Sequence, residues 1–470
     1  MSANIYAIIG LASVLGGAIA ISAPAVADEA SLREIYEELV EINTTLSVGS
    51  CTRAAEAMAA RLEAAGMPEA AIHVIVPSEF PAQGNLVAEL AGSAASEGAI
   101  LLLAHIDVVE ANPEDWERDP FTLIEEDGYF YGRGTADDKA MAAIFVDLMI
   151  TYLHEGYRPP RTIKLALTCG EETAHHFNGV EYLVANHREL IEADFAINEG
   201  GLGRLDPDGT RVYNGVLAGE KVYQDFRLEI RNPGGHSSRP QRDNAIYRLA
   251  AALGRIEAYE FPIEFNSTTR AFFESLAEIE TGQAAEDMRA ILSTPPDPAA
   301  LARIKQDPSY NAVLHTTCIA TQLDAGHAPN ALPQRAAANV NCRIFPGHTQ
   351  EEILRTLTGV VADDGIDVSF VHSPETVGES PPLTAAIVDP IARVTEELWP
   401  GVPVVFSLLA GATDARFLTP HGIPTYGVSG IFADQATRNA HGLNERTRVQ
   451  SLYEAREFLD RLVRIYARGD

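Results

Sequence analysis

The sequence predicts an α/β protein with a mostly parallel sheet, into which a smaller ferredoxin-like domain is inserted. Strand-like and helix-like segments alternate between residues 30 and 200, which is typical of parallel sheets covered by helices. Residues 100–104 form a continuous apolar run of strand length, as expected for a strand buried on both faces. A change of pattern near Gly219 indicates the inserted domain.

Length, composition and charge limit the classes of protein that the chain can represent. A chain of 470 residues exceeds what one hydrophobic core usually serves, so two domains are expected. A hydrophobic fraction of 46% is that of a globular protein. The formal net charge of −31 argues against nucleic acid as a partner, because a phosphate backbone would be repelled.

The amino-terminal segment has the pattern of a secretory signal. An apolar stretch over residues 5–21 is followed by the small residues Ala25, Val26 and Ala27. We therefore expect a signal peptide over residues 1–27, a periplasmic or secreted mature chain and no stable membrane insertion after processing. An uncleaved anchor is the alternative, because the segment lacks the usual Lys or Arg. The four cysteines are scattered, and their spacing does not pair them.

The first part of the chain alternates helices and strands. Apolar residues at Leu32, Ile35, Leu39 and Ile42 share one helical face. The expected helices are 30–48, 52–65, 135–154 and 180–187, and the expected strands are 72–76, 85–90, 100–104, 162–168 and 195–198. This order indicates a mostly parallel sheet with helices on both faces.

The second part of the pattern predicts a split βαβ arrangement. Strands are expected at 222–231, 313–323, 335–344 and 366–371, and helices at 245–258 and 350–361. The charged, Pro-containing stretch 260–308 is set aside as an insertion without an assigned role. The remaining order is βαβ-βαβ, the ferredoxin-like order. We expect a catalytic domain in two parts, 28–218 and 373–470, and an inserted lid or dimerisation domain at 219–372.

Polar residues follow the strand at 100–104. Residues i and i+2 of an extended segment face the same way, so His105 and Asp107 can reach one site. The imidazole would be a metal ligand and the carboxylate an orienting group. The alternative is a core histidine that is hydrogen-bonded to a neighbouring acid.

Three further carboxylate loops and a late histidine follow this pattern. Asp137 and Asp138 come directly after a glycine turn, where they could be no more than helix caps. Glu171 and Glu172 follow a buried strand, where adjacent carboxylates would repel each other, so either one points to solvent or both serve a cation. Glu199 follows another strand, and His441 lies in a loop near the carboxyl terminus. Together these residues indicate a metal site at the carboxyl ends of the strands.

These motifs, in this order, resemble the M20 family of metallopeptidases, which includes aminoacylases, glutamate carboxypeptidases and carboxypeptidase S. The resemblance implies that His105, in H-x-D, binds a metal that Asp107 helps to orient. It implies that Asp137, in G-x-G-x-x-D-x-K, bridges two metals and that Glu171 is the general base. Further implied metal ligands are Glu172, Glu199 and His441. Ala140 departs from the family pattern, in which glycine usually follows the lysine.

The resemblance also implies an active site completed by the inserted domain. His236, in a G-x-H-[ST] loop, would reach the active site of a partner subunit and stabilise the tetrahedral intermediate, which predicts a homodimer. Asn330 and Arg343 would bind the substrate, and arginine offers a bidentate fork for a carboxylate. Gly411 would lie near the substrate. The roles of Asp414 and Arg416 could be purely structural.

We therefore expect an exported hydrolase that binds two divalent ions. Zinc is the first expectation for both ions, which would share Asp137 and a water. Metal-activated water would attack an amide next to a free carboxylate, and Glu171 would take the proton. A carboxypeptidase or dipeptidase activity is the first expectation. An aminoacylase acting on N-acyl amino acids is the alternative, and a non-catalytic binding protein on the same scaffold would be expected to have lost Glu171 or a ligand.

Overall fold

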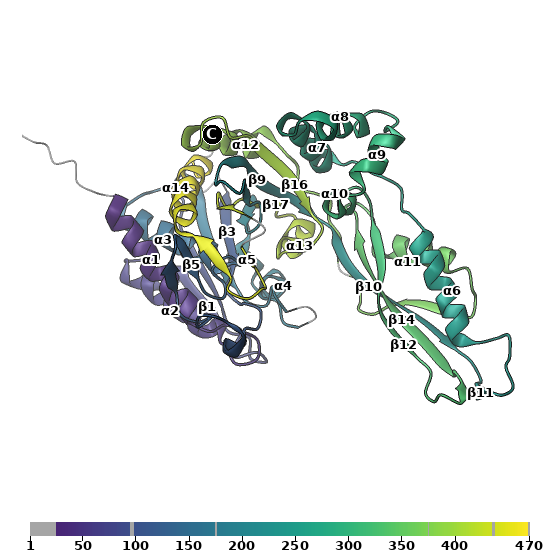
Figure 1. Ribbon diagram of the computed structural model, residues 1–470. Helices are drawn as coiled ribbons and strands as arrows, with labels where there is room; N and C mark the ends of the chain where they lie inside the picture. Colours follow the sequence, from purple (N-terminus) through teal and green to yellow (C-terminus); the bar gives the residue numbers. More distant parts are fainter. Residues whose placement is uncertain (1–24, 95–97, 174–175, 375, 435–437, 469–470) are drawn as a thin grey trace, which may run out of the picture.

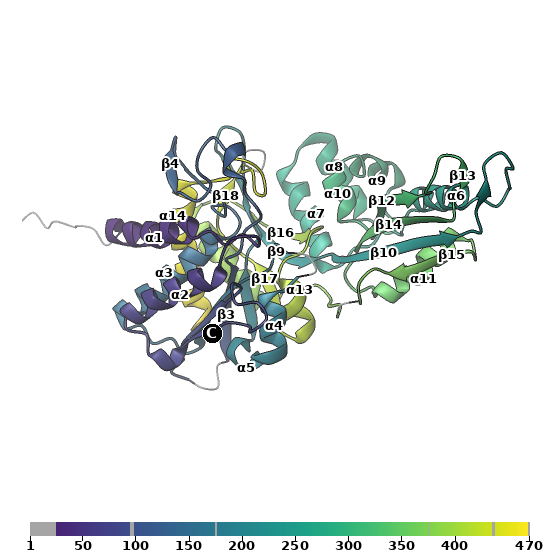
Figure 2. The same ribbon diagram turned by 90° about the horizontal axis from the view of Figure 1, so that it is seen from below.

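The protein is built from a large α/β part and an elongated second part that projects from it. The computed structural model describes residues 25–94, 98–173, 176–374, 376–434 and 438–468. Figures 1 and 2 show both parts, with strand β3 in the first and strand β10 in the second. Most of the predicted signal segment, residues 1–24, lies outside the described residues.

A ten-stranded mixed sheet forms the centre of the first part. Strands β6, β3, β7 and β17 are parallel neighbours, and β1 and β2 extend the sheet antiparallel. The strands in spatial order are β1 (Ile72–Ile75), β2 (Asn85–Leu90), β6 (Thr162–Thr168), β3 (Ala99–His105), β7 (Phe195–Asn198), β17 (Thr425–Gly427), β9 (Arg211–Glu220), β8 (Gly203–Leu205) and β18 (Phe432–Ala433), and β16 (Val404–Leu409) pairs with β9. The expected mostly parallel centre is confirmed.

Helices cover both faces of this sheet, which explains the continuous apolar run of β3. Leu102 packs into the cluster under one set of helices, and its neighbour Leu101 packs into the cluster on the opposite face. The first set is α1 (Ala25–Glu41), α2 (Cys51–Ala64), α3 (Lys139–Glu155), α12 (Ala385–Leu398) and α14 (Val449–Tyr466). The second set is α4 (Gly179–Asn186), α5 (Arg188–Ile191) and α13 (Ala415–Leu418).

Short elements complete the first part. A three-stranded sheet contains β4 (Ile124–Glu126), β5 (Tyr129–Tyr131) and β19 (Arg446–Arg448), and the 3-10 turns are η1 (Glu69–Ala71), η2 (Pro113–Asp115) and η3 (Thr419–His421). Because β19 pairs with β5, the loop that carries His441 is held beside the glycine turn that carries Asp137.

A four-stranded antiparallel sheet forms the second part. Its spatial order is β12 (Thr317–Ala325), β14 (Arg335–Ile344), β10 (Val222–Arg231) and β15 (Ile366–Phe370), with helices α6 (Ala245–Ala258) and α11 (Gln350–Val361) in the chain order of a ferredoxin-like fold. Phe226 and Leu228 of β10 pack in one apolar cluster with Leu249 of α6 and Leu357 of α11. A two-stranded ribbon, β11 (Gly235–His236) and β13 (Ala331–Leu332), lies at the far tip (Figures 1 and 2).

The stretch 260–308 belongs to a separate helical layer. It contains α7 (Ser267–Ile279), α8 (Gly282–Ile291), α9 (Pro298–Ile304) and, just after it, α10 (Pro308–Ala312). Helix α7 packs against β16 of the first part, and residues of α7, α8 and α9 share an apolar cluster with Val405 and Leu408. This layer therefore covers the sheet of the first part, although its sequence lies within 219–372.

Two disulfides join all four cysteines. Cys51 of α2 bonds to Cys169, just after β6, across a sequence separation of 118 residues. Cys318 and Cys342 are directly opposite each other on β12 and β14, 24 residues apart in sequence. The pairing depends on which strands and helices become neighbours, so the spacing in the sequence could not reveal it.

Some predicted boundaries were wrong for identifiable reasons. The helix predicted to reach residue 48 ends at Glu41, because the Asn43 side chain accepts the Thr45 N–H and the Thr44 hydroxyl donates to the Ile106 carbonyl. The helix predicted from residue 135 begins at Lys139, since the preceding N–H groups bind a buried carboxylate described below. None of the helices in the described ranges is long and apolar enough to cross a membrane.

Candidate metal centre

The candidate site lies where three neighbouring strands end. His105 is the last residue of β3, Glu171 and Glu172 follow β6, and Glu199 follows β7, in a sheet whose order is β6-β3-β7. The carboxyl ends of these parallel strands meet at one edge, so side chains far apart in sequence converge there. Gly170 has φ +97°, and a Cβ there would lie 2.1 Å from the Phe177 carbonyl oxygen. Only glycine fits this turn into Glu171.

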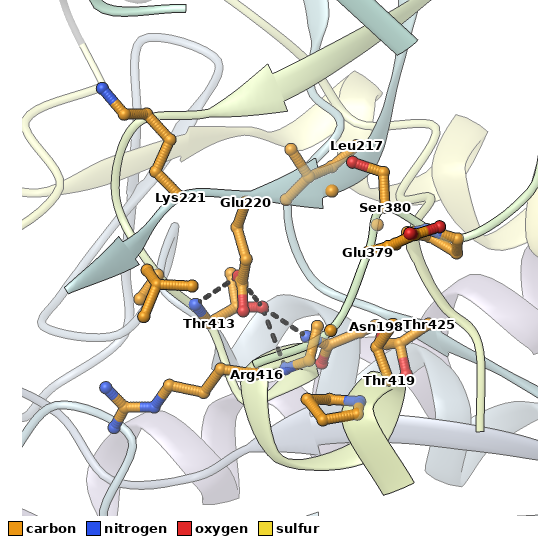
Figure 3. Close-up of a pocket in the computed structure, with 18 of the residues that line it drawn as sticks. Asn198, Leu217, Glu220, Lys221, Glu379, Ser380, Thr413, Arg416, Thr419 and Thr425 are labelled. Atoms are coloured by element: carbon orange, nitrogen blue, oxygen red, sulfur yellow. Dashed lines mark hydrogen bonds between the residues drawn. The ribbon is translucent and has the colours of Figure 1, made fainter. Parts of the chain in front are cut away.

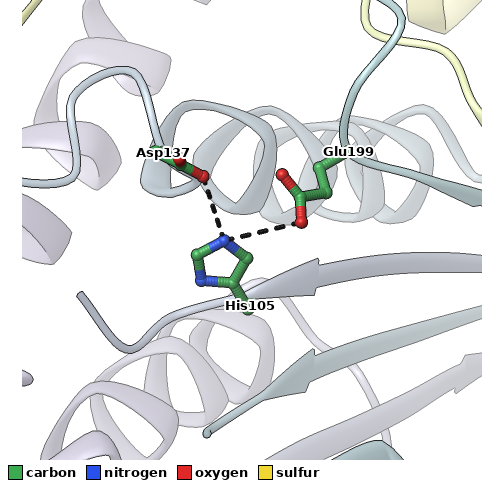
Figure 4. Close-up of side chains that lie close together, drawn as sticks. All are labelled: His105, Asp137 and Glu199. Atoms are coloured by element: carbon green, nitrogen blue, oxygen red, sulfur yellow. Dashed lines mark hydrogen bonds and ion pairs between the residues drawn. The ribbon is translucent and has the colours of Figure 1, made fainter. Parts of the chain in front are cut away.

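One group of ligand atoms surrounds His105. Its Nε2 lies 3.2 Å from Asp137 Oδ1 and 3.8 Å from Glu199 Oε1, as Figure 4 shows. One nitrogen and two carboxylate oxygens from these residues lie within 4.8 Å of one another. This donor set is suitable for a divalent ion such as Zn²⁺.

A second group shares Asp137 with the first. The His441 Nε2 lies 3.2 Å from Asp137 Oδ2 and 2.9 Å from Glu172 Oε1. The two oxygens of Asp137 thus face two different histidines, the arrangement expected of a bridging carboxylate. A third possible group combines His105, Glu171 and Glu172. The first two groups contain the ligands predicted from the sequence. In the third group Glu171, the predicted general base, also lies within reach of a metal.

The electrostatics of the cluster favour a cation. Burial raises the pKa of Glu171 to about 10 and that of Glu199 to about 8. Hydrogen bonds to Asp137 and Glu172 raise the pKa of His441 to about 10. Burial lowers the pKa of His105, but the Asp137 hydrogen bond and the Glu199 charge raise it well above its usual value overall. Positive charge among these carboxylates would relieve their mutual repulsion.

Asp107 contacts the site differently from the sequence interpretation. The His105 Nδ1 lies 3.0 Å from the Asp107 backbone carbonyl and 3.7 Å from its carboxylate, so the backbone is the nearer orienting group. The Asp107 carboxylate instead accepts the N–H groups of Glu171 and Glu172, at 3.3 and 3.1 Å. Asp107 therefore positions the double-glutamate turn as well as lying beside His105.

Glu445 is a site residue to which sequence reasoning assigned no role. Its buried carboxylate accepts N–H groups from Gly134, Ala136 and Asp137, at 3.2, 2.7 and 3.1 Å, and pairs with the guanidinium of Arg133. It thereby holds the backbone that carries the bridging carboxylate. The available signals were an arginine inside a glycine turn, which needs an acidic partner when buried, and a glutamate four residues after His441.

The loop at residues 411–414 is fixed by the half-buried carboxyl group of Glu220 and the buried one of Asp414. Figure 3 shows Glu220 directed at Thr413, whose N–H and hydroxyl donate to it at 2.7 and 2.9 Å. Asp414 accepts from the Thr168 hydroxyl at 3.1 Å and from the Asn178 amide at 2.7 Å. Asp414 is thus bonded to the end of β6, behind Glu171, and these contacts are structural.

The metal-ligand cluster opens into a cavity of about 600 Å³. Gly411 lines it together with Asp137, Glu171, Glu199 and His441. The structure therefore brings the predicted glycine to the same space as the metal ligands.

Three predicted residues lie elsewhere in the same chain. His236 is exposed on the distal ribbon, where the Ser237 N–H donates to the Asn330 carbonyl at 3.0 Å. Arg343 lies over the ring of Tyr223, with its guanidinium 4.6 Å from the ring centroid. Neither the distal ribbon nor Arg343 lines the cavity. Within one chain these residues are not part of the metal-ligand cluster.

The fold and this cluster of possible metal ligands are compatible with a metal-dependent hydrolase, and comparison with known proteins gives the family of the chain. The sequence profile of Peptidase family M20/M25/M40 matches residues 101–465, and the chain belongs to this family. It is an enzyme of the hydrolase class. The predicted resemblance is confirmed.

Most of the chain is similar to proteins named N-fatty-acyl-amino acid synthase/hydrolase and to proteins named carboxypeptidase S-like. The human protein named N-fatty-acyl-amino acid synthase/hydrolase PM20D1 is 30% identical over 381 residues, covering 79% of this chain and 75% of the relative. The Dictyostelium discoideum protein named Probable carboxypeptidase S-like 2 is 26% identical over 405 residues, covering 84% of this chain and 76% of the relative.

Solved structures confirm the fold. The M20 family metallo-carboxypeptidase Sso-CP2 from Sulfolobus solfataricus superposes with a TM-score of 0.68 at 18% identity, covering 93% of this chain and 99% of the other. The Bacillus subtilis YXEP protein, described as a dinuclear metal binding peptidase from the M20 family, has a TM-score of 0.57 at 14% identity, with coverages of 94% and 98%.

Proposed function

We propose that this protein hydrolyses the amide bond of N-acyl amino acids, with two divalent cations and Glu171 as the general base. The observation that carries the proposal is Asp137, whose two oxygens face two histidines in two separate ligand groups. Hydrolysis of peptides by a carboxypeptidase-type reaction is the second candidate, favoured by the carboxypeptidase S-like relatives.

The donor atoms fit two zinc ions. His105, Asp137 and Glu199 would hold one, and Asp137, Glu172 and His441 the other, each through imidazole nitrogen and carboxylate oxygen. Bound divalent cations at such a site supply a Lewis acid that acidifies water and polarises a carbonyl.

Glu171 would move the proton in this reaction. Its backbone N–H is fixed by Asp107, and its side chain lines the cavity beside the ligand residues. The carboxylate would accept a proton from the attacking water and deliver it to the leaving amine nitrogen. Nearby cations would lower the pKa of Glu171 and favour the carboxylate form that this role needs.

The choice of N-acyl amino acids over peptides has two supports. The human relative is named for fatty-acyl amino acids. In addition, the cavity beside the metal ligands is lined by many apolar side chains.

A panel of substrates on the metal-loaded enzyme tests this function. Glu171→Gln should retain both metals and lose about 10²–10⁴-fold in kcat, because an amide cannot accept the proton. Glu181→Gln, an exposed glutamate on α4, is the matched control and should behave as wild type. Elemental analysis accompanies kinetics on N-acyl amino acids and dipeptides. Wild-type turnover by Glu171→Gln would show that Glu171 is not the general base. Loss of a metal from this variant would show that Glu171 is a metal ligand.

We also propose that the enzyme is a homodimer in which His236 serves the active site of the partner subunit. Strand β12 is an edge of the second sheet and exposes Ile319 and Leu323, at 67% and 66%, which suits pairing with a second copy. His236→Ala and Glu171→Gln should each be nearly inactive. Mixed heterodimers should regain a fraction of wild-type activity, because one site then holds both intact groups. If activity does not recover after proven subunit exchange, His236 either serves the active site of its own chain or has no catalytic role.

Export is the last part of the proposal. Two disulfides that join all four cysteines are typical of proteins folded in an oxidising compartment. A signal ending at Ala27 predicts that protein from the native host begins at Asp28. Amino-terminal sequencing tests this prediction, and an intact Met1 in a membrane fraction would support the uncleaved anchor instead.

A further inference from the structure

The cavity at the metal-ligand cluster is lined by two chemically different sets of side chains. The polar set contains carboxylates and His441. The apolar set consists of large apolar or aromatic side chains from β9, β16, α7 and the loops before β8 and β18, namely Leu202, Tyr213, Phe272, Val405, Leu408 and Ile431.

We propose that this apolar set of side chains binds the acyl chain of the substrate, and that Phe272 on α7 limits the length of chain that fits. The inference rests on the proposed hydrolysis of N-acyl amino acids and deepens it. This proposal gives a function to the helical layer of α7 to α10, because Phe272 of this layer lines the cavity.

Helix α7 is held firmly enough to act as a wall. The Thr268 hydroxyl, which is buried, donates to the Ala218 carbonyl of β9 at 2.9 Å. Asn266 and Thr269 form a capping box at the start of the helix. Phe273, the residue after Phe272, is fully buried in the apolar cluster that contains Val405 and Leu408. These contacts fix the backbone of α7, and of Phe272 with it, against β16; Figure 1 shows α7 beside β16.

The ring of Phe272 also packs against another aromatic ring. Its centroid lies 6.2 Å from that of Tyr310 on α10, and the two rings meet edge to face. Phe272 itself is only half-buried, so part of its side chain remains free to contact a ligand. The layer therefore presents one supported aromatic ring to the space that opens from the metal ligands.

Size decides between the two neighbouring cavities. The active-site cavity, at about 600 Å³, lies in the range of sites that bind drug-sized ligands. The cavity in Figure 3, between Glu220 and Ser380, offers about 50 Å³ and would need to open before it admitted an alkyl chain. The acyl chain is therefore assigned to the larger cavity.

Chain-length dependence of binding tests the assignment without turnover. Glu171→Gln protein loaded with zinc is titrated calorimetrically with N-acyl derivatives, from acetyl to hexadecanoyl, of the amino acid that the wild type hydrolyses best. Each added CH₂ should tighten Kd about two- to fourfold until the cavity is filled, and further carbons should then add nothing.

Two substitutions should move this limit in opposite directions. Phe272→Leu, added to the Glu171→Gln protein, should let longer chains bind, with about tenfold tighter Kd for a chain two carbons beyond the original limit. Leu202→Phe, from the loop before β8, should shorten the limit. Glu274→Ala changes an exposed residue of the same helix and should leave the limit unchanged.

The outcomes separate the two proposals. If the wild type hydrolyses dipeptides and no N-acyl amino acid, the substrate class is wrong and the acyl pocket is overturned with it. If N-acyl amino acids are hydrolysed but Kd does not tighten with chain length, the acyl pocket is wrong and the hydrolase proposal stands. The acyl pocket is also wrong if the limiting chain length is identical in the Phe272→Leu, Leu202→Phe and parent proteins.

Discussion

Replacing Glu445 with glutamine should weaken both the fold and the metal centre. Arg133 and Glu445 form an ion pair whose side chains are 3% and 1% exposed. One carboxylate oxygen receives N–H groups from Arg133 and Gly134, and the other receives those of Ala136 and Asp137. A glutamine side chain has only one acceptor oxygen, so its NH₂ group would face two of the N–H donors. Because glutamine has no negative charge, Arg133 would also be left without a counter-charge.

The magnitude follows from the burial of this pair. Removing one partner of a buried ion pair costs about 3–5 kcal/mol, because the remaining charge is left without compensation. Glu397→Gln is the control, since Glu397 pairs with Arg393 on the exposed surface of α12 and such pairs contribute about 0–1 kcal/mol. The metal centre should also respond, with metal affinity about 10–100-fold weaker, as expected when an outer support of a ligand is lost.

Tryptophan fluorescence during urea unfolding is a suitable assay. Both tryptophans, Trp116 and Trp399, are buried in the first part, and the Arg133 guanidinium lies 5.0 Å from the Trp116 ring centroid. A double-mutant cycle with Arg133→Met isolates the pair, because the double variant no longer buries a lone charge. A Glu445→Gln protein within about 0.5 kcal/mol of wild type, or a cycle additive within about 0.5 kcal/mol, would refute the reasoning.

Three further predictions address the supports of the site and of the second part. Replacing Cys51 and Cys169 with alanine should cost about 5 kcal/mol of unfolding free energy, because the disulfide closes a long loop of 118 residues, and unchanged urea denaturation would contradict it. Asp107→Asn should lower kcat about 10-fold or more with metals retained, since its amide cannot accept both glutamate N–H groups; unaltered kcat would exclude this positioning role. The hydrogen bonds from Arg248 lower the pKa of Asp363 from 3.8 to about 2, so this carboxylate stabilises the fold above pH 4 and the contribution disappears as pH falls towards 2. Asp363→Asn should therefore be less stable than wild type at pH 7 and equal to it near pH 2 in thermal melts; a constant difference would be inconsistent with the pair.

Much of the fold was predictable because its signals are local. The strand at 162–168, the helix at 245–258 and the strand at 335–344 were each predicted with the bounds that the structure has. Period-2 or continuous apolar patterns and helical faces are written in neighbouring residues, and burial of those faces then selects the layers. That His105, Glu171, Glu172 and Glu199 lie at or just after strand ends could also be predicted from the sequence, whereas His441 lies in a loop and was singled out through the family resemblance.

Other features depended on contacts between distant residues. Glu445 binds backbone groups more than 300 residues earlier in the chain. Cys51 meets Cys169 only when α2 packs onto the sheet that contains β6. Phe272 reaches the cavity because α7 packs against β16.

The sequence by itself therefore determined the class of fold, the order of its elements and the residue types that gather at the strand ends. The tertiary structure alone decided which oxygen of Asp137 faces which histidine, which residues hold the backbone of Asp137 and which apolar side chains line the cavity at the metal ligands. The physical reason is that local patterns fix secondary structure, whereas pairing of buried charges and the shape of a cavity depend on how separate elements pack together.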